Sequence, residues 1–415
     1  MGSGKTTYFM DGINRSFWTN TLSMDDGLTC EFPRFLYVTP FLEEVERVQD
    51  HCSVLDFRDP APVKGKKLNH LLTLIEAGAN IATTHALFRL LTKEMHEAIQ
   101  TQNYVLILDE VITCVEPFDG ISKDDQEMLM SEGKLLADPM TGHVRWGGDH
   151  VGYKGKHEDV MRLAQNGNLT LYRERLLQLF PTDFLTCFSH VYILTYLFEG
   201  SPMSAYLRSH GVEYVVRTLH DGQLVPKADY EVRALAKLEP MVSVYEGKAN
   251  RWGQQVGENP FSAGWLNRQK DDVLSQVRRS VEYWFKNIAR TPSSYNAYTT
   301  LKGLKSKLKG MRYTKGFIPC NARATNKYRD KASVAYLFNV YPNPLVEGYL
   351  RETGMPMDKD VYALSELVQW LWRSRIRDGH PIKVFIPSLR MRTLLKDWLS
   401  GRFCVTARHN IRTYA

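Results

Sequence analysis

The sequence predicts an α/β protein with two parallel-sheet domains in tandem, residues 1–200 and 201–415, and a helical insert at about 115–188. Three observations support this prediction. Short apolar runs alternate with helical patterns in the first half, polar residues stand at the ends of those runs, and the charge changes sign between the halves.

Four apolar runs in the first half, at 34–40, 80–84, 104–111 and 190–196, predict strands. Continuous apolar strands separated by helices are typical of a parallel sheet covered on both faces. Ligands of such sheets bind at the carboxyl ends of the strands. The polar residues that follow these runs are Thr39, Thr84, Asp109, Glu110 and Thr195.

The insert contains two helical patterns around a glycine-rich loop, and residues 172–188 belong to the second of them. In the second half, the segments 213–219, 240–247, 317–320 and 383–388 read as strands. A helix is predicted from about Asp360 to Asp378, ended by Gly379 and Pro381.

The chain opens with the residues of half a phosphate-binding loop: Gly2, Ser3, Gly4, Lys5, Thr6 and Thr7. Backbone N–H groups of such a loop cradle phosphates, the lysine reaches the outer phosphates, and the threonine hydroxyl holds Mg²⁺. The alternative interpretation is a flexible terminus. The strand and the first glycine that precede a complete loop would lie before residue 1, so the natural product is longer, another chain supplies the strand, or the first domain is impaired.

The segment "YVLILDEV" ends a buried-strand pattern with two carboxylates, Asp109 and Glu110. A nucleoside triphosphatase needs one carboxylate for the Mg²⁺ shell and another to polarise the attacking water. The alternative is a helix N-cap with an acidic first turn. The glycine-lysine-threonine segment upstream favours the catalytic interpretation.

A third segment, 363–379, places Gln369, Arg373 and Arg377 at helical spacing. Like charges four positions apart repel each other, and a shared anion such as a γ-phosphate would offset that repulsion. The alternative is a solvated basic face.

The net charge of +7 is unevenly distributed. Residues 1–200 hold 18 Lys and Arg against 28 Asp and Glu, and residues 201–415 hold 35 against 18. Residues 298–331 concentrate ten basic side chains against one Asp, with aromatic residues interspersed, which predicts a nucleic-acid backbone track. Its lysines include Lys302, Lys305, Lys307 and Lys309.

Composition excludes other classes. No run of 18 apolar residues is present, which predicts no membrane span, and no basic segment precedes an apolar one at the N-terminus, which predicts no signal peptide. The six cysteines form no C-x-x-C pair, so we expect buried thiols in a reducing cytoplasm, that of the host cell if the protein is viral.

The segments "MGSGKTT", "FLYVTPFLEEVERV", "IATTHALF", "LILDEV", "YILTYLFEGSPM", "NARATNKYRD" and "QWLWRSRIR" stand in the order of helicase superfamily 2 motifs. From residue 1 to about 395, the chain resembles the DEAD/DEAH-like DNA helicases of bacteriophages and mobile elements. The resemblance implies two RecA-like domains, ATP and Mg²⁺ as cofactors, and ATP hydrolysis that drives movement along DNA in phage replication or recombination, with other replication proteins as partners and no membrane.

The resemblance also implies residue roles. Lys5, Thr6 and Asp109 would hold phosphate and Mg²⁺, and Glu110 would activate water. Thr195 would couple hydrolysis to movement, and Gln369, Arg373 and Arg377 would complete the ATP site. The implied nucleic-acid contacts are Thr39, Thr84, Arg323 and Thr325. Family members space the arginines of the last motif three apart, whereas the candidates here, Arg373, Arg375 and Arg377, stand two apart, which leaves the choice of arginine finger open. In the mechanism that the resemblance implies, ATP binding would bring Arg373 or Arg377 onto the γ-phosphate.

Two alternatives remain from the sequence: a packaging-type motor ATPase, and a nucleic-acid-binding protein with impaired catalysis. A packaging motor would carry a nuclease with clustered carboxylates. Residues 301–350 contain only Asp330 and Glu347 as acids, which disfavours it.

Overall fold

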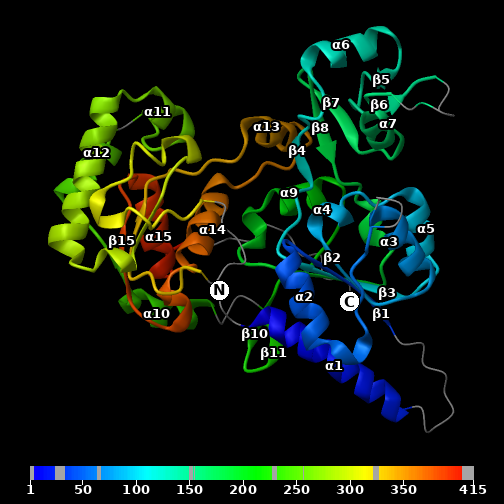
Figure 1. The fold of residues 1–415 in the computed structure, drawn as a ribbon, viewed down its shortest axis with the longest axis horizontal. Helices are drawn as coiled ribbons and strands as arrows, with labels where there is room; N and C mark the ends of the chain where they lie inside the picture. The colour runs from blue at the N-terminus through cyan, green and yellow to red at the C-terminus, as the bar shows by residue number, and fades with distance from the viewer. Residues whose placement is uncertain are drawn as a thin grey trace. The chain divides into compact units, whose positions relative to one another are not determined.

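The computed structural model describes residues 4–23, 33–62, 67–148, 153, 155–226, 231–255, 257–320 and 327–403. The chain divides into two compact units (Figure 1). The N-terminal unit comprises Gly4–Tyr214 together with Asn343–Met357, and the C-terminal unit contains Val215–Pro342 and the residues from Asp358 onward. The division lies 14 residues beyond the expected boundary at 200/201, and one segment of the second half returns to the N-terminal unit.

The N-terminal unit is organised around a four-stranded sheet of order β2-β1-β3-β9, in which all neighbouring strands are parallel. Its strands are β1 (Arg34–Thr39), β2 (Ile81–Thr84), β3 (Tyr104–Asp109) and β9 (His190–Leu194). The four apolar runs of the first half therefore form one parallel sheet, as predicted. Its helices are α1 (Lys5–Ser23), α2 (Leu42–His51), α3 (Lys67–Glu76), α4 (His85–Phe88), α5 (Lys93–Gln100), α8 (Asp183–Thr186), α9 (Pro202–Ser209) and α13 (Pro344–Glu352).

One face of this sheet is covered by α1 and α2. Met10 and Ile13 of α1 lie in the same buried cluster as Tyr37 of β1, Val45 of α2 and Ile107 of β3. Since side chains alternate along a strand, the neighbours at every second position share this face. Asp109 follows Ile107 by two positions, so its carboxylate points to the side on which α1 and α2 pack.

The insert between β3 and β9 is a mixed α/β element, and the prediction of a helical insert was wrong. It contains antiparallel sheets of order β4-β8-β7 and β5-β6. The helical pattern at 172–188 is broken because Arg173 and Glu174 both adopt positive φ, which forms the turn of the β7–β8 hairpin. Its elements are β4 (Val115–Pro117), α6 (Lys123–Ser131), β5 (Leu135–Ala137), β6 (Val144–Trp146), α7 (Glu158–Gln165), β7 (Leu169–Tyr172) and β8 (Arg175–Leu179).

The C-terminal unit contains a second parallel sheet, of order β12-β15-β14-β13. The strands are β12 (Val242–Val244), β13 (Asn296–Thr299), β14 (Ser333–Tyr336) and β15 (Ile382–Phe385), and β10 (Arg217–His220) and β11 (Gln223–Pro226) form a separate antiparallel hairpin. The helices are α10 (Glu231–Leu238), α11 (Ala263–Arg268), α12 (Asp271–Tyr283) with its π-helical continuation η6 (Trp284–Ala289), α14 (Lys359–Leu371) and α15 (Leu389–Leu399).

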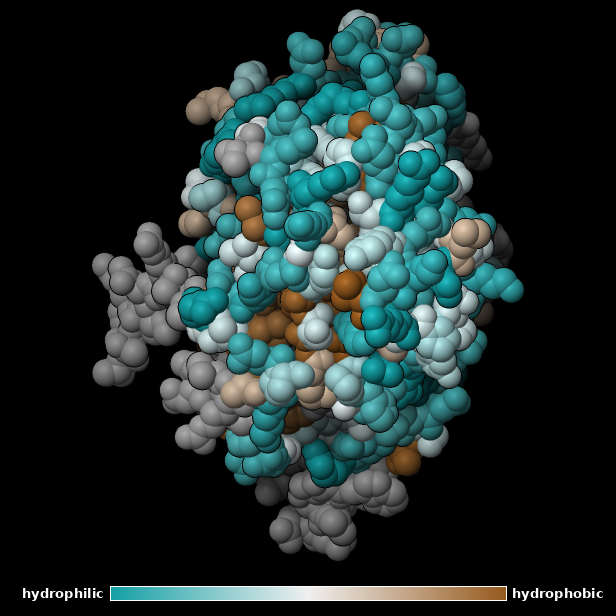
Figure 2. All heavy atoms as spheres, turned by 90° about the vertical axis from the view of Figure 1, so that its left-hand side faces the viewer, coloured by the Kyte–Doolittle hydropathy of each residue, from teal (hydrophilic) through white to brown (hydrophobic). Residues whose placement is uncertain are grey.

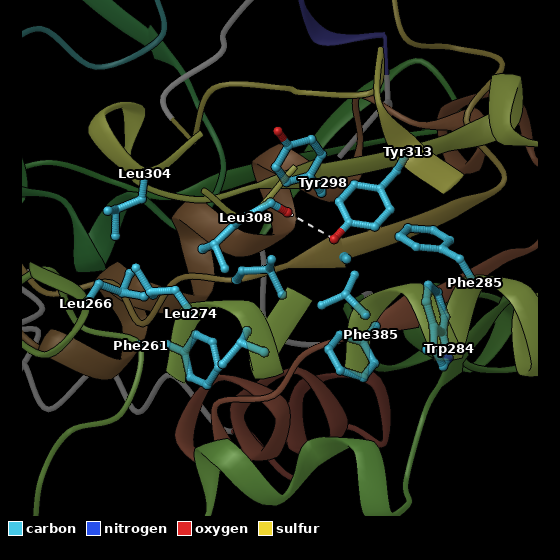
Figure 3. Close-up of a cluster of buried hydrophobic side chains, with 14 of the residues drawn as sticks. Phe261, Leu266, Leu274, Trp284, Phe285, Tyr298, Leu304, Leu308, Tyr313 and Phe385 are labelled. Carbon is cyan, nitrogen blue, oxygen red and sulfur yellow. Dashed lines mark hydrogen bonds between the residues drawn. The ribbon is translucent and has the colours of Figure 1, made fainter. Parts of the chain in front are cut away.

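One core of this unit joins α11, α12 and the 300–318 segment to the sheet (Figure 3). Leu304, Leu308 and Tyr313 point into the cluster formed with Leu274 of α12 and Trp284 of η6. The segment 317–320 was predicted as a strand, but it forms only an isolated bridge, Tyr298 with Phe317, along the edge of β13. The predicted helix at 360–378 also ends early, at Leu371.

Within the described ranges, the structure has no helix that is both long enough and apolar enough to cross a membrane. Cys52, Cys114 and Cys187 are buried, as expected of thiols that act as small apolar side chains, and Cys320 is half-buried.

Candidate functional site

The first helix begins directly at the glycine-lysine-threonine segment. Gly4 has φ +73°, a conformation that favours glycine, and its carbonyl accepts the Tyr8 amide at 2.8 Å, which closes the first turn of α1. The amide groups of the first turn have no partner within their own helix and suit an anion. Gly2 and Ser3, which were also predicted to bind phosphate, lie outside the described residues. Thr7 lies exposed in this turn.

Two predicted residues that are far apart in sequence meet at this helix start. The Thr6 hydroxyl donates toward Asp109 and lies 3.3 Å from each carboxylate oxygen. Asp109 is the last residue of β3, a fully buried strand, and only 9% of its surface is exposed. The fold therefore brings the phosphate-loop residues to the carboxyl end of β3, where a ligand of a parallel sheet is expected.

The site has unbalanced charges. Burial, and then the neighbouring Glu110 charge, raise the pKa of Asp109 to about 7. Burial likewise lowers the pKa of Lys5, although the charges of Glu110 and Asp109 oppose that shift. Both shifts have the same main cause, because burial removes water that would stabilise the charged forms. A bound phosphate and a cation would supply opposite charges to Lys5 and Asp109 respectively.

The oxygens of Thr6 and Asp109 fit Mg²⁺ by their chemistry, since this ion prefers hard oxygen ligands. No group of three or more His, Cys, Asp or Glu side chains that could hold a metal occurs among the described residues. Mg²⁺ commonly completes its shell with substrate phosphates and water, so one carboxylate and one hydroxyl are a sufficient protein contribution.

Glu110 has a strained backbone. Its φ is +71°, which is uncommon for a residue with a side chain, and its amide donates to the Leu194 carbonyl at 3.2 Å. The Thr195 hydroxyl donates to the Glu110 carboxylate at 3.4 Å. Such strain persists only where the surroundings hold it and is concentrated at functional sites. The last residue of β9 thus holds the backbone of Glu110, and Thr195, which follows β9, holds its side chain.

Three residues of this site were missed by the sequence analysis. Arg47 of α2 lies 3.9 Å from Asp109 and 2.8 Å from Glu44, and the buried hydroxyl of Tyr37 has no hydrogen-bond partner among the described residues. The charge of Asp109 contributes to raising the pKa of Tyr37, after burial. The signal in the sequence was the "LEEVERV" pattern, whose polar positions Glu44 and Arg47 share one helix face at i, i+3 spacing.

The threonines at the other strand ends have local structural roles. Thr39 is fully buried and donates to the Phe41 carbonyl at 3.0 Å, so the structure does not support its predicted contact with nucleic acid. Thr84 caps α4 by accepting the Leu87 amide at 3.4 Å. The register pairs Thr39 with Thr84 and Asp109 with Leu194, so these residues share one edge of the sheet, as predicted.

The predicted arginine-finger face does not exist as one helix face. Since α14 ends at Leu371, Arg373 follows the helix and Arg377 lies in a separate 3₁₀ turn. Gln369 and Arg373 are buried at 7% exposure each, whereas Arg377 is exposed. Gln369 donates to Ser365 at 3.2 Å. The physical reason is that "WRSR" leaves the helical path after the Trp372 cap, so the i, i+4, i+8 spacing is lost.

Most of the predicted basic track, residues 298–331, lies within the described residues. Lys302, Lys305, Lys307 and Lys309 are all exposed. Lys307 pairs with Asp271 at 2.7 Å, and the Lys305 ammonium lies 4.8 Å from the centre of the Phe317 ring. Arg323 and Thr325 lie outside the described residues.

The fold and site define an α/β protein with two parallel sheets and an oxygen-rich site beside a helix start. The chain belongs to the YonV family: it is 35% identical over 422 residues to the SPbeta prophage-derived uncharacterized protein YonV of Bacillus subtilis (strain 168), with 97% of each chain covered. Residues 236–399 match the family described as the YonV C-terminal Rossmann-like domain, and residues 115–178 match the YonV middle domain. The middle domain coincides with the mixed insert, and the Rossmann-like domain with the second parallel sheet.

Proposed function

We propose that this protein is an ATP-hydrolysing nucleic-acid translocase of the helicase type. One observation carries the proposal: the Thr6 hydroxyl lies 3.3 Å from both oxygens of Asp109, at the start of α1 and the end of a buried strand. Phosphate-loop proteins need this pairing of hydroxyl and carboxylate to hold Mg²⁺. A helix cap alone would not require a contact across 103 positions.

The roles follow from the positions of the side chains. Lys5, half-buried within the electrostatic influence of Glu110 and Asp109, would meet the outer phosphates, and Thr6 and Asp109 would hold Mg²⁺. Glu110, held by Thr195 and the Leu194 carbonyl, would orient and deprotonate the attacking water. Mg²⁺-bound ATP would supply the phosphoryl group and the charge that balances the site.

The nucleic-acid part of the proposal rests on charge. The second half carries 35 Lys and Arg against 18 Asp and Glu, and the described lysines of the 298–331 stretch are exposed, except for the half-buried Lys331. A surface of this kind attracts the phosphate backbone without regard to sequence. The relative in Bacillus subtilis is prophage-derived by name, which supports a role in bacteriophage DNA replication or recombination.

The second candidate is a nucleic-acid-binding protein with impaired hydrolysis. It is favoured by the N-terminal sheet, in which β9 is an edge strand with His190 and Tyr192 exposed.

Steady-state ATP hydrolysis with Mg²⁺, measured with and without single-stranded DNA, tests the proposal. We expect turnover that Lys5→Ala abolishes and that the exposed control Lys93→Ala retains. Nucleotide binding is measured in parallel by the fluorescence of a labelled ATP analogue. Binding without turnover would support the second candidate, and absence of both would overturn the nucleotide site.

A further inference from the structure

We propose that a single-stranded nucleic acid binds along a two-row basic surface of the C-terminal unit. One row is Arg279, Tyr283, Lys286 and Arg290 on α12 and η6, and the other is Lys305, Lys307, Lys309 and Arg312 in the neighbouring segment. The inference rests on the proposed function, because it names the surface that the nucleic acid would occupy. Only the second row belongs to the basic stretch predicted from the sequence, residues 298–331.

The first row consists of exposed side chains at the end of α12, on η6 and at the residue that follows η6. Arg279, Tyr283, Lys286 and Arg290 are separated by four, three and four positions, and all four are exposed. Arg279 and Tyr283 lie about one turn apart on α12, Lys286 lies on η6, and Arg290 caps η6 with a positive φ. A stretch of π-helix, Trp284–Ala289, lies within it. Short π-helical stretches often occur at functional sites.

The second row runs beside the first. Lys307 pairs at 2.7 Å with Asp271, the first residue of α12, and the Met311 amide donates at 2.9 Å to Glu282 near its end. The segment and the helix therefore run in the same direction. Leu308 and Tyr313 anchor the segment in the same core as α12, and the Tyr313 hydroxyl donates to the Leu308 carbonyl (Figure 3).

Two of the three acidic residues of α12 are already engaged. Asp271 is paired with Lys307, and Glu282 accepts the Met311 amide. Asp272 is exposed at the start of α12 and lies about two turns from Arg279. The two rows contribute seven cations and therefore retain a strong positive charge, and the side of the molecule that carries α12 is mainly hydrophilic (Figure 2).

Exposed uncharged side chains favour a single strand over a duplex. Tyr283 is 53% exposed within the first row, and Met311 is 85% exposed beside the second. An aromatic face can stack on an unpaired base, whereas the bases of a duplex are already stacked. A positively charged groove with aromatic side chains is the usual surface for single strands of any sequence.

The lysines of the second row also have an alternative explanation, which is protection of a sheet edge. The 300–318 segment covers β13, the edge strand of the sheet, and lysines at an edge prevent pairing with other chains. That explanation accounts for lysines in the second row. It does not account for the first row, because α12 and η6 pack against the sheet through core residues such as Trp284, which contacts Phe385 of β15.

The test is the affinity of the whole protein for fluorescent oligo(dT), measured without nucleotide at several salt concentrations. Two double variants each remove two positive charges from one row: Arg279→Gln with Lys286→Gln, and Lys305→Gln with Lys309→Gln. The matched control is Lys237→Gln with Lys248→Gln, which removes the same charge from exposed positions flanking β12, at the opposite edge of the sheet.

Each row variant should flatten the slope of log affinity against log salt by about 1.4, from about 0.7 per phosphate contact, while the control retains its slope. Tyr283→Ala should weaken oligo(dT) binding about 10-fold and leave duplex binding unchanged. If the variant with Arg279→Gln and Lys286→Gln keeps the salt slope of the control, the proposal is overturned. If both row variants keep that slope, the lysines only protect the β13 edge. Equal binding of duplex and oligo(dT), together with an unaffected Tyr283→Ala, would also overturn it. Loss of ATP hydrolysis with intact oligo(dT) binding would contradict the proposed function alone.

Discussion

The Thr6 hydroxyl lies at equal distances, 3.3 Å, from the two carboxylate oxygens of Asp109. A symmetric approach of this kind places both residues within reach of one cation, because oxygens that share an octahedral shell lie about 3 Å apart at the Mg²⁺ bond length. The contact joins the start of α1 to the end of β3, so the parallel sheet assembles the site from two segments that carry little information separately.

The first prediction concerns Glu110. Glu110→Gln should retain nucleotide binding and lower ATP turnover by about 10²–10⁴-fold, because it removes the base that deprotonates water but preserves the shape of the side chain. Turnover and labelled-nucleotide affinity are measured together, with Glu94→Gln on α5 as an exposed control. Parental turnover in the variant would show that Glu110 is not the base.

The second prediction concerns the pH dependence of stability. The pKa of Asp109 is raised to about 7, so between about pH 4 and pH 7 the folded protein keeps a proton that the unfolded chain releases. The free energy of unfolding therefore falls as pH rises through this window, and the whole penalty is present above pH 7. Asp109→Asn removes this charge. In nucleotide-free protein, the free energy of unfolding of the variant should therefore rise by about 2 kcal/mol relative to that of the parent as the pH goes from 5 to 8.

Urea denaturation at several pH values measures this difference. The control is Asp50→Asn on α2, an exposed position, which should follow the parent curve at every pH. A constant difference between Asp109→Asn and the parent across the range would mean that Asp109 ionises as an ordinary carboxyl group.

Much of the N-terminal sheet could be predicted from sequence because β1, β2 and β3 are buried on both faces, although the edge strand β9 is partly exposed. Each reads as an uninterrupted apolar run, and the polar residues at their ends share one edge in the structure. The same local reasoning failed in the insert, where "YRERLLQLF" has an apolar spacing that suits a helix. The positive φ of Arg173 and Glu174 turns the segment into a hairpin, and no glycine or asparagine marks that turn.

The site was predictable only in part. Lys5, Thr6, Asp109 and Glu110 carry recognisable chemistry in sequence. Arg47 does not, because its relation to Asp109 depends on α2 packing on the same face of the sheet as α1. The spacing of Arg373 and Arg377 was misleading for the opposite reason, since it was measured on a helix that ends before either residue.

The third prediction concerns Arg47. Its guanidinium, 3.9 Å from Asp109, lowers the pKa of that carboxyl against the larger effects of burial and Glu110. Arg47→Gln should therefore raise the pKa of Asp109 further, so the window in which stability falls with pH should extend above pH 7. The measurement is the same urea series, and Arg58→Gln, an exposed arginine paired with Asp56, is the control. An unchanged window would show that Arg47 interacts with Glu44 alone.

The fourth prediction concerns α13, which belongs to the second half of the sequence but packs in the N-terminal unit. The rings of Tyr349 and Tyr172 meet edge to face with centroids 5.6 Å apart, and Arg173 forms an ion pair with Glu352. Gly348 allows this approach, since a Cβ there would lie 2.8 Å from the Tyr172 hydroxyl.

Tyr349→Ala should therefore destabilise the β7–β8 hairpin by about 1–2 kcal/mol, the range for a partly buried aromatic pair. Hydrogen exchange measures this locally: amides of Leu169–Leu179 should exchange about 5–30-fold faster, and those of β14 should not change. Tyr295→Ala, at a tyrosine 45% exposed in the C-terminal unit, is the control and should leave the hairpin unaffected. If the hairpin keeps its protection in Tyr349→Ala, α13 does not stabilise the insert and only passes beside it.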